Sequence, residues 1–508
     1  MPRITRQWDS PFTEEWNFEG GSSRRYCTHI PTGAKFREQD WTSRSPDWHS
    51  NIEAQWDYGG RILCASKPPK EAKEIVVREE HKGTIVEEYA SQMMTPPTGA
   101  AAERQSFMQQ ASNMNTTSYR VPMHIVKEVA ELYPKSRVPW FISTWNEKEG
   151  PEEFDRAFRV ALSAMDADKS PGAFWDKIAS DNQGVITLAY DKLKDEVHRL
   201  ATLVIESDFE DLIGSELFKT TGIVYKLFVK GELHTREKIE EGRQRLIFSS
   251  PLHMTILERM WFQPQNDAEI KAAGDGELIP SRPGTPFTSE GARVLKECVS
   301  EFKNRLVSTD QKGWDVRVPG WLMDADIKRR FHCLEGSQES KGRWLRGAMN
   351  LNHIVKFKVV AFSDGHFVYQ KVAGWWPSGS YRTSGSNSGN RVIIRRVAAG
   401  DCEAITMGDD AVEGWLEDLY QRYAKYGFTL KHHEFVIPSD FEFCSKHFMN
   451  GIVVPVETSV RKMILNVYRH DSPEARSSIK QELKYYDNLD EFIRLGILDP
   501  DPTISDWQ

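Results

Sequence analysis

Residues 404–412 read AITMGDDAV, and this short stretch is the sharpest feature of the sequence. Apolar runs flank a Gly-Asp-Asp turn, a pattern that predicts a β-hairpin with two carboxylates at its tip, Asp409 and Asp410. Adjacent carboxylates repel each other, and a divalent cation with hard oxygen ligands relieves the repulsion. The alternative is an ordinary acidic turn, because Asp and Gly both favour turns. An amphipathic helix is predicted next, over residues 413–425.

A third carboxylate follows a predicted strand upstream, over residues 305–309. Asp310 ends that strand and can reach the hairpin turn across a shared sheet. Three carboxylates can hold two Mg²⁺ ions about 3.5–4 Å apart, the arrangement for in-line phosphoryl transfer. The sequence therefore predicts a metal and catalytic site at Asp310, Asp409 and Asp410. Asp315 lies past a glycine and is predicted to face the sugar of a bound nucleotide.

A loop of small residues lies between these acidic elements. Residues 378–387 read SGSYRTSGSN, and a helix is predicted to begin within them. Thr383 and Asn387 are four residues apart, so they share one helix face. A flexible Ser/Gly linker is the alternative. The neighbouring Trp375 and Trp376 argue against a loose linker.

Cations alternate with glutamates farther upstream, over residues 230–247. One interpretation is a surface helix with i,i+4 ion pairs. Gly231 and Gly242 argue against one continuous helix. A cationic ribbon is also what a triphosphate needs as a channel wall. The residues predicted for this role are Lys230, Lys238, Arg243 and Arg245.

Overall composition limits the classes of protein. The 508 residues carry a formal net charge of −8, so any nucleic-acid surface must be local. Residues 341–396 contain ten lysines and arginines against one acid, which predicts a solvated basic face or a phosphate-tracking groove with aromatic platforms. Six scattered cysteines exclude a disulfide scaffold and favour a reduced compartment. We expect no membrane span and no signal peptide.

These elements, in this order, resemble the motifs of RNA-dependent RNA polymerases of positive-strand RNA viruses, most closely the sobemovirus and polerovirus type. The cationic ribbon resembles motif F, Asp310-x4-Asp315 motif A, residues 378–387 motif B and Gly408-Asp409-Asp410 motif C. Residues 441–448 resemble motif E, which grips the primer, and residues 168–172 resemble motif G at the template path. RNA contacts are implied for Ser170, Pro171, Gly172, Cys444 and Ser445.

The resemblance implies an α+β right-hand polymerase with fingers, palm and thumb. Its palm would be a ferredoxin-like antiparallel sheet, and its thumb would be helical. The expected domains are an N-terminal extension of unknown role, partly linker over 95–118 (residues 1–120), the main part of the fingers (121–300), a palm with a fingers insertion at about 335–375 (301–448) and the thumb (449–508).

The implied activity is template-directed RNA synthesis from NTPs with two Mg²⁺ ions, or Mn²⁺ as an alternative. Nucleotide contacts are implied for Lys230, Lys238, Arg243, Arg245, Asp315, Ser378, Gly379, Thr383 and Asn387. Expected partners are the RNA template, the nascent RNA and a genome-linked protein primer. The expected location is the host cytoplasm, in replication complexes held on membranes by a partner. A reverse transcriptase and a catalytically inactive RNA-binding scaffold are the alternatives.

Overall fold

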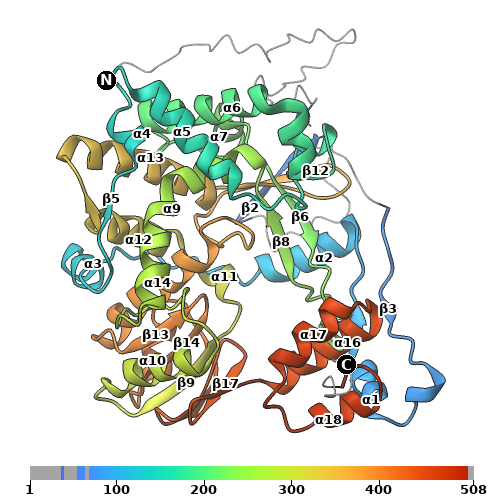
Figure 1. Cartoon of the computed structure of the whole chain (residues 1–508). Helices are drawn as coiled ribbons and strands as arrows, with labels where there is room; N and C mark the ends of the chain where they lie inside the picture. The colour runs from blue at the N-terminus through green and yellow to red at the C-terminus, as the bar shows by residue number, and fades with distance from the viewer. Residues whose placement is uncertain (1–35, 39–53, 63–67, 501–508) are drawn as a thin grey trace, which may run out of the picture.

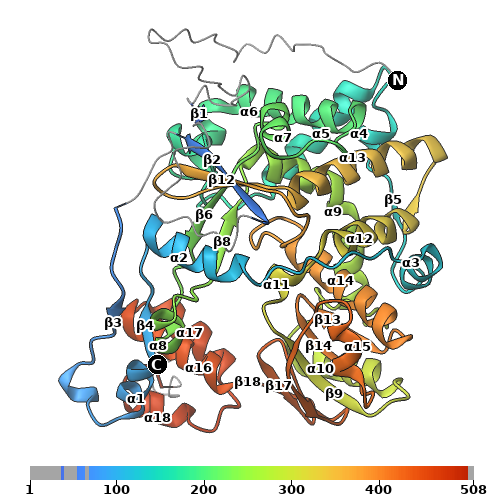
Figure 2. The same cartoon turned by 180° about the vertical axis from the view of Figure 1, so that it is seen from behind.

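The structure is a computed structural model that describes residues 36–38, 54–62 and 68–500. Much of the expected N-terminal extension falls outside these ranges. Figures 1 and 2 show three regions: a helix-rich upper part, a lower part built on the sheet that carries the Gly-Asp-Asp turn, and a helical C-terminal part beside it. We call them the fingers, the palm and the thumb.

The palm is built on four antiparallel strands in the order β13-β14-β9-β15. The strands are β9 (Leu306–Gln311), β13 (Ala404–Met407), β14 (Asp410–Gly414) and β15 (Leu430–Phe435). The helices around it are α10 (Ser289–Ser300), α11 (Trp314–Arg317), α12 (Gly320–His332), α14 (Thr383–Ala399) and α15 (Leu419–Ala424). The strand predicted over 305–309 and the hairpin predicted at the Gly-Asp-Asp turn are both present, as β9 and as β13 with β14.

The two faces of the palm sheet have different neighbours, because successive strand side chains point to opposite faces. Thr309 and Glu413 are buried on the face covered by α14 and α15, where they bond to side chains of these helices. Leu306, Ile405 and Val412 join a second apolar core with α10 and a three-stranded sheet. That sheet consists of β16 (Asp440–Phe443), β17 (Lys446–Met449) and β18 (Ile452–Pro455).

The fingers combine a six-stranded sheet with long helices. The strands, in sheet order, are β1 (Phe36–Glu38), β2 (Trp56–Ile62), β12 (His366–Gln370), β11 (Val359–Ala361), β6 (Tyr225–Val229) and β8 (Leu246–Ser249). A short parallel pair joins β5 (Ser136–Arg137) to β10 (Leu334–Glu335). The helices are α2 (Ala100–Ala111), α3 (Met123–Ala130), α4 (Trp140–Ser143), α5 (Gly150–Ser163), α6 (Asn182–Glu206), α7 (Gly214–Thr221), α8 (Arg236–Glu240), α9 (Leu252–Gly274) and α13 (Gln338–Lys356).

The thumb contains a segment from far upstream. Its helices α16 (Glu457–Arg469), α17 (Pro473–Glu482) and α18 (Leu489–Arg494) share an apolar core with α1 (Ile85–Gln92), as both views show. Beside α1, β3 (Lys73–Glu74) and β4 (Met93–Thr95) form a small sheet with β7 (His234–Thr235). The chain therefore runs from the fingers into the thumb before it builds the palm. Among the described residues, no helix is long and apolar enough to cross a bilayer.

Two local predictions are wrong. The linker predicted for 95–118 contains α2, because Phe107 is fully buried and stacks on Trp375 with ring centroids 5.1 Å apart. The helix predicted for 413–425 begins only at Leu419, because β14 continues through Gly414. The side chain of Glu413 is fully buried and bonded there, and these tertiary contacts override the helical periodicity.

Both interpretations of the basic run 341–396 are wrong for three arginines in its C-terminal part. Arg382, Arg391 and Arg395 are fully buried, as are Trp375 and Trp376. Their acidic partners come from outside the run: Glu258 for Arg382, Glu413 for Arg391, and Asp401 together with Glu413 for Arg395. The excess of positive charge in the sequence is therefore largely neutralised by ion pairs inside the fold.

Candidate active site

The Gly-Asp-Asp turn is a tight hairpin. Met407 pairs with Asp410, so Gly408 and Asp409 form the connection between β13 and β14. Gly408 has a φ of 65°, a backbone conformation that residues other than glycine rarely adopt. Its backbone N–H donates to Ser388 Oγ on α14 at 2.9 Å. The motif B helix therefore holds the carboxylate-bearing turn directly.

The three predicted catalytic carboxylates lie together at the ends of neighbouring strands. Ala411 pairs with Thr309, which places Asp410 beside Asp310. Burial, together with the charges of Asp409 and Asp310, raises the pKa of Asp410 to about 7. Burial also raises the pKa of Asp409, again with a contribution from Asp310. The site therefore concentrates negative charge that the fold alone leaves poorly compensated.

The residues fit a divalent cation by chemistry, because carboxylate oxygens are the ligands that Mg²⁺ prefers. Their arrangement is not a preformed metal cage: among the described residues, no three acidic, His or Cys side chains converge to hold an ion. Asp310 Oδ2 is instead paired with Lys431 Nζ of β15 at 2.6 Å. A cation at this site would have to take the place of that ammonium group.

Asp315 and Asn387 meet, as the sequence predicted for a ribose contact. Asn387 Nδ2 donates to Asp315 Oδ1 at 2.7 Å, which joins the segment after β9 to α14. Burial and the charge of Asp409 raise the pKa of Asp315 to about 7, although the bond from Asn387 lowers it. Asn387 Oδ1 has no hydrogen-bond partner among the described residues. This buried acceptor is available to a hydroxyl of a ligand.

Thr383, predicted to contact the nucleotide from the same helix face as Asn387, bonds within its own loop. Thr383 Oγ1 donates to the Ser380 carbonyl at 2.8 Å and accepts from Trp376 Nε1 at 3.2 Å. The hydroxyl therefore closes the loop before α14. Thr383 still begins the helix that presents Asn387.

The loop with Ser378 and Gly379 is anchored to the fingers. The Ser378 carbonyl accepts from the backbone N–H of Phe248 on β8 at 2.8 Å. Gly379 has a φ of 114°, and a Cβ there would lie 2.8 Å from the Phe248 carbonyl oxygen. Glycine is thus required both by the backbone angle and by the close approach of β8.

Cations from the fingers and the thumb gather around one carboxylate, Glu232. Its oxygens lie 2.9 Å from Lys230 Nζ, 2.9 Å from Arg245 Nη1 and 3.8 Å from Lys462 Nζ. Burial alone would raise the pKa of Glu232, but the three cations outweigh it and hold the pKa at about 2. We call these four residues the Glu232 cluster.

Lys238 and Arg243 stand differently toward this cluster. Half-burial lowers the pKa of Lys238, and the positive charges of Lys462, Arg245 and Lys431 lower it further. Lys238 is therefore close to the cluster and to Lys431, the lysine that pairs with Asp310. Arg243 pairs with Glu237 and Glu241 at the α8 end.

The comparisons with known proteins can now be set beside this geometry. A sequence model of the family described as viral RNA-dependent RNA polymerase matches residues 189–481. The chain belongs to the viral RNA-dependent RNA polymerase family. The resemblance stated from the sequence is confirmed. By its family, the chain is an RNA-directed RNA polymerase.

Relatives of the polymerase come from several plant and fungal viruses. The RNA-directed RNA polymerase of Mushroom bacilliform virus is 31% identical over 70% of this chain and 92% of that protein. The Replicase polyprotein P2AB of Southern bean mosaic virus is 30% identical over 76% of this chain but only 40% of the polyprotein. The crystal structure of a human picorbirnavirus RNA-dependent RNA polymerase has a TM-score of 0.56, with 14% identity and 84% of each chain covered. This likeness confirms the right-hand α+β fold.

The polymerase residues predicted to contact RNA fall into two groups. Pro171 and Gly172 are buried, with the Pro171 carbonyl accepting from Leu252 N at 2.9 Å, so Ser170 alone of this trio is exposed. Cys444 and Ser445 form the turn between β16 and β17, with φ of 54° and 56°. Cys444 lines a small cavity together with Asp310 and Asp410. The motif E turn thus lies at the carboxylates, whereas two of the motif G residues hold the backbone in place.

Sequence reasoning missed three charged residues of the polymerase site. Lys431 pairs with Asp310 because β15 lies beside β9 in the sheet, a pairing that a sequence pattern does not reveal. Lys462 comes from the thumb and joins the fingers at Glu232. Glu258 of α9 accepts from Ser380 Oγ and from Arg382 Nε, both at 3.0 Å, and so holds the motif B loop. The sequence around each of these three residues contains no motif that would predict such a contact.

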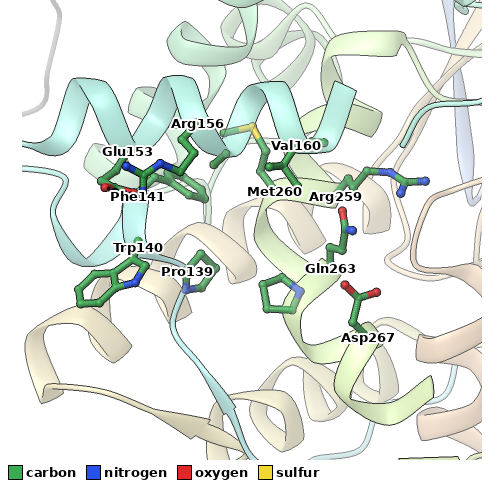
Figure 3. A pocket seen from close by; sticks show the side chains of 13 residues that line it. Pro139, Trp140, Phe141, Glu153, Arg156, Val160, Arg259, Met260, Gln263 and Asp267 are labelled. Atoms are coloured by element: carbon green, nitrogen blue, oxygen red, sulfur yellow. Dashed lines mark ion pairs between the residues drawn. The ribbon is translucent and has the colours of Figure 1, made fainter. Parts of the chain in front are cut away.

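A separate pocket lies on the fingers of the polymerase between α4, α5 and α9 (Figure 3). Trp140 and Val160 are exposed at its rim, and Phe141 and Met260 lie deeper. None of the residues predicted to bind metal, nucleotide or RNA lines it. It is therefore distinct from the carboxylate site.

Proposed function

We propose that this polymerase copies an RNA template into RNA from NTPs during replication of a positive-strand RNA virus. One observation carries the proposal: Asp310, Asp409 and Asp410 gather at one end of the palm sheet, where Lys431 pairs with Asp310 and the charges of Arg245 and Lys431 act on Asp409. Such an arrangement suits a nucleotide with its metal ions. The cations would face the negative triphosphate, and the carboxylates would face the positive metal ions.

Asp310, Asp409 and Asp410 would hold two Mg²⁺ ions, or Mn²⁺ as an alternative. When bound, the ions supply charge neutralisation at the β- and γ-phosphates and a lower pKa for the primer 3′-hydroxyl. The raised pKa values of Asp409 and Asp410 support this role, because a nearby cation favours the charged carboxylates. Without a metal ion, the Lys431 ammonium is the cation paired with Asp310.

The other residues orient the nucleotide. Asp315 and Asn387 would bind the ribose 2′-hydroxyl, and the unpartnered Asn387 Oδ1 is a ready acceptor for it. Lys230, Lys238 and Arg245 would neutralise the triphosphate, while Ser378 and Gly379 would line the nucleotide side of the motif B loop. Ser170, Cys444 and Ser445 would contact template and primer RNA. The genome-linked protein primer and the attachment to host membranes through a partner are further parts of this proposal.

Incorporation of a radiolabelled ribonucleotide on a homopolymer RNA template tests the function. We expect Asp409→Asn to abolish incorporation while leaving RNA binding and folding nearly intact. Asp418→Asn is the matched control, since Asp418 is exposed and pairs only with Arg422 of its own helix among the described residues. Retention of more than a few per cent of activity by Asp409→Asn would contradict the assignment. RNA binding without incorporation by the wild type would favour the inactive scaffold, and preference for dNTPs would favour a reverse transcriptase.

A further inference from the structure

A buried ionic network centred on one carboxylate lies on the palm face opposite Asp310 and Asp410. Glu413 of β14 is at its centre, with its side chain completely buried. Glu413 Oε1 accepts from Thr309 Oγ1 and from Arg391 Nη2, the latter at 2.8 Å. Glu413 Oε2 accepts from Tyr423 OH at 2.6 Å and from Arg395 Nη1 at 3.2 Å. One carboxylate thus receives four hydrogen bonds.

The network joins four separate elements of the palm. Thr309 is on β9, Glu413 on β14, Arg391 and Arg395 on α14, and Tyr423 on α15. Cross-links close it: Arg391 Nη2 also donates to Thr309 Oγ1 at 2.7 Å, and Arg391 Nη1 donates to Tyr423 OH at 2.8 Å. Thr309, Glu413, Arg391 and Tyr423 each bond to at least two other elements of the palm, so none of them can shift without breaking bonds to both.

Each strand member is close in sequence to a proposed metal ligand. Thr309 immediately precedes Asp310, and its side chain points to the opposite face of β9. Glu413 follows Asp410 by three residues on β14. Arg391 lies one helical turn after Asn387, which bonds to Asp315. The network therefore fixes the backbone that presents the carboxylates and the ribose contact.

Stability alone does not account for such a network. Replacing a buried ion pair by well-packed apolar side chains is often neutral or stabilising, because the charges lose hydration. An apolar contact between β9 and α14 would tolerate small sliding movements, whereas directional bonds to one carboxylate do not. A misplacement of about 1 Å can cost about a hundredfold in rate.

We propose that Thr309 and Glu413 are positioning residues for polymerisation, which set the spacing of Asp310 and Asp410 from the opposite face of the sheet. This inference rests on the proposed function. It assigns to the buried network the task of keeping two mutually repelling strand ends at the separation that metal ions require. The network is buried between the sheet and helices α14 and α15, so its role would be indirect.

Two isosteric variants separate positioning from stability. Thr309→Val removes one buried hydroxyl next to Asp310. Thr221→Val removes an equally buried hydroxyl in the fingers, where Thr221 Oγ1 donates to the Leu217 carbonyl at 2.9 Å. We expect similar small losses of thermal stability in both. Thr309→Val alone should lower kcat about tenfold or more with little change in the KM for NTP.

A second readout needs no catalysis. Binding of Mn²⁺ to the polymerase without RNA, followed by electron paramagnetic resonance, should weaken about threefold or more in Thr309→Val and stay within about twofold of wild type in Thr221→Val. Glu413→Gln keeps the size of the side chain but not its charge. If this variant folds, it should lose more kcat and more Mn²⁺ affinity than Thr309→Val.

Wild-type kcat and Mn²⁺ affinity in Thr309→Val, at a lowered melting temperature, would overturn the inference. Equal losses of kcat and of Mn²⁺ affinity in Thr309→Val and Thr221→Val would overturn it as well. If the wild type incorporates no nucleotide, the proposed function fails, and the Mn²⁺ affinities of the two variants alone decide whether the network positions the carboxylates.

Discussion

The two faces of the palm sheet hold charge in opposite ways. On one face, Asp310 and Asp410 lie side by side, and burial with mutual repulsion raises the pKa of Asp410 to about 7. On the other face, burial would also raise the pKa of Glu413, but Arg391 and Arg395 outweigh it and hold the pKa below its usual value. The strands β9 and β14 carry both arrangements within a few residues.

The difference separates architecture from ligand binding. A buried acid with all its hydrogen bonds made within the fold has no capacity left for a ligand. Acids that repel each other at a sheet end are destabilised until a cation arrives. Uncompensated charge in a fold therefore indicates a binding site. Fully compensated charge indicates a structural link between elements.

The largest contrast is expected in folding stability. Glu413→Ala leaves the buried Arg391 without a partner carboxylate and Arg395 with Asp401 alone, and we expect a loss of about 3–5 kcal/mol in the free energy of unfolding. Asp410→Asn on the other face of the same strand removes repulsion, so its unfolding free energy at pH 8 with EDTA should equal or exceed that of wild type. Chemical denaturation measures both. Comparable destabilisation by the two variants would remove the distinction between the faces.

Sugar selection is the next effect in size. A deoxynucleotide leaves Asp315 and Asn387 without their hydroxyl partner, which costs about 1–3 kcal/mol per group. We therefore expect Asn387→Ala to lower kcat/KM for NTP roughly tenfold to a hundredfold relative to matched dNTP. An unchanged NTP/dNTP ratio in both Asn387→Ala and Asp315→Ala would show that the ribose is selected elsewhere. Thr383→Val is the control, because its hydroxyl closes the loop and does not reach Asp315.

The pH dependence of stability sharpens the comparison. The pKa of Asp315 rises from an ordinary 3.8 to about 7 in the folded chain, so the folded state binds its proton more tightly than the unfolded state. Stability should therefore fall as pH rises from about 4 to 7, by at most about 1.4 kcal/mol per pH unit for this group. Unfolding free energies at pH 5, 6 and 7 in EDTA should show a shallower slope in Asp315→Asn. An equal slope in variant and wild type would contradict the raised pKa.

The smallest effect is expected in the Glu232 cluster. Lys462 is partly exposed and 3.8 Å from Glu232, so solvent screens it and its loss should be modest. We expect Lys462→Ala to raise the KM for NTP about twofold to fivefold with kcat unchanged. Lys484→Ala, an exposed lysine at the end of the same thumb region, should leave the KM at the wild-type value. Matching KM values in the two variants would place Lys462 outside the triphosphate path.

Local spacing predicted most of the site. The hairpin at Gly408 and Asp409 follows from turn chemistry, and the pairing of Asp315 with Asn387 was expected from the resemblance to a known motif order. The helix predicted from residue 413 failed because its periodicity is real but the buried partners of Glu413 extend β14 instead. The linker predicted over 95–118 failed because composition does not reveal that Phe107 has a pocket to fill.

The sequence by itself determined the acidic turn, the strand that ends in Asp310 and the family, because these depend on residue type and spacing over short distances. Long-range folding settles which charges are paired inside the palm and which lie at the candidate site. Arg391 and Arg395 belong to a basic run, yet Glu413 neutralises them inside the palm, while Lys431 and Lys462 reach the site from β15 and from the thumb. Electrostatic energy depends on the distance between charges and on their burial, and neither is a property of position along the chain.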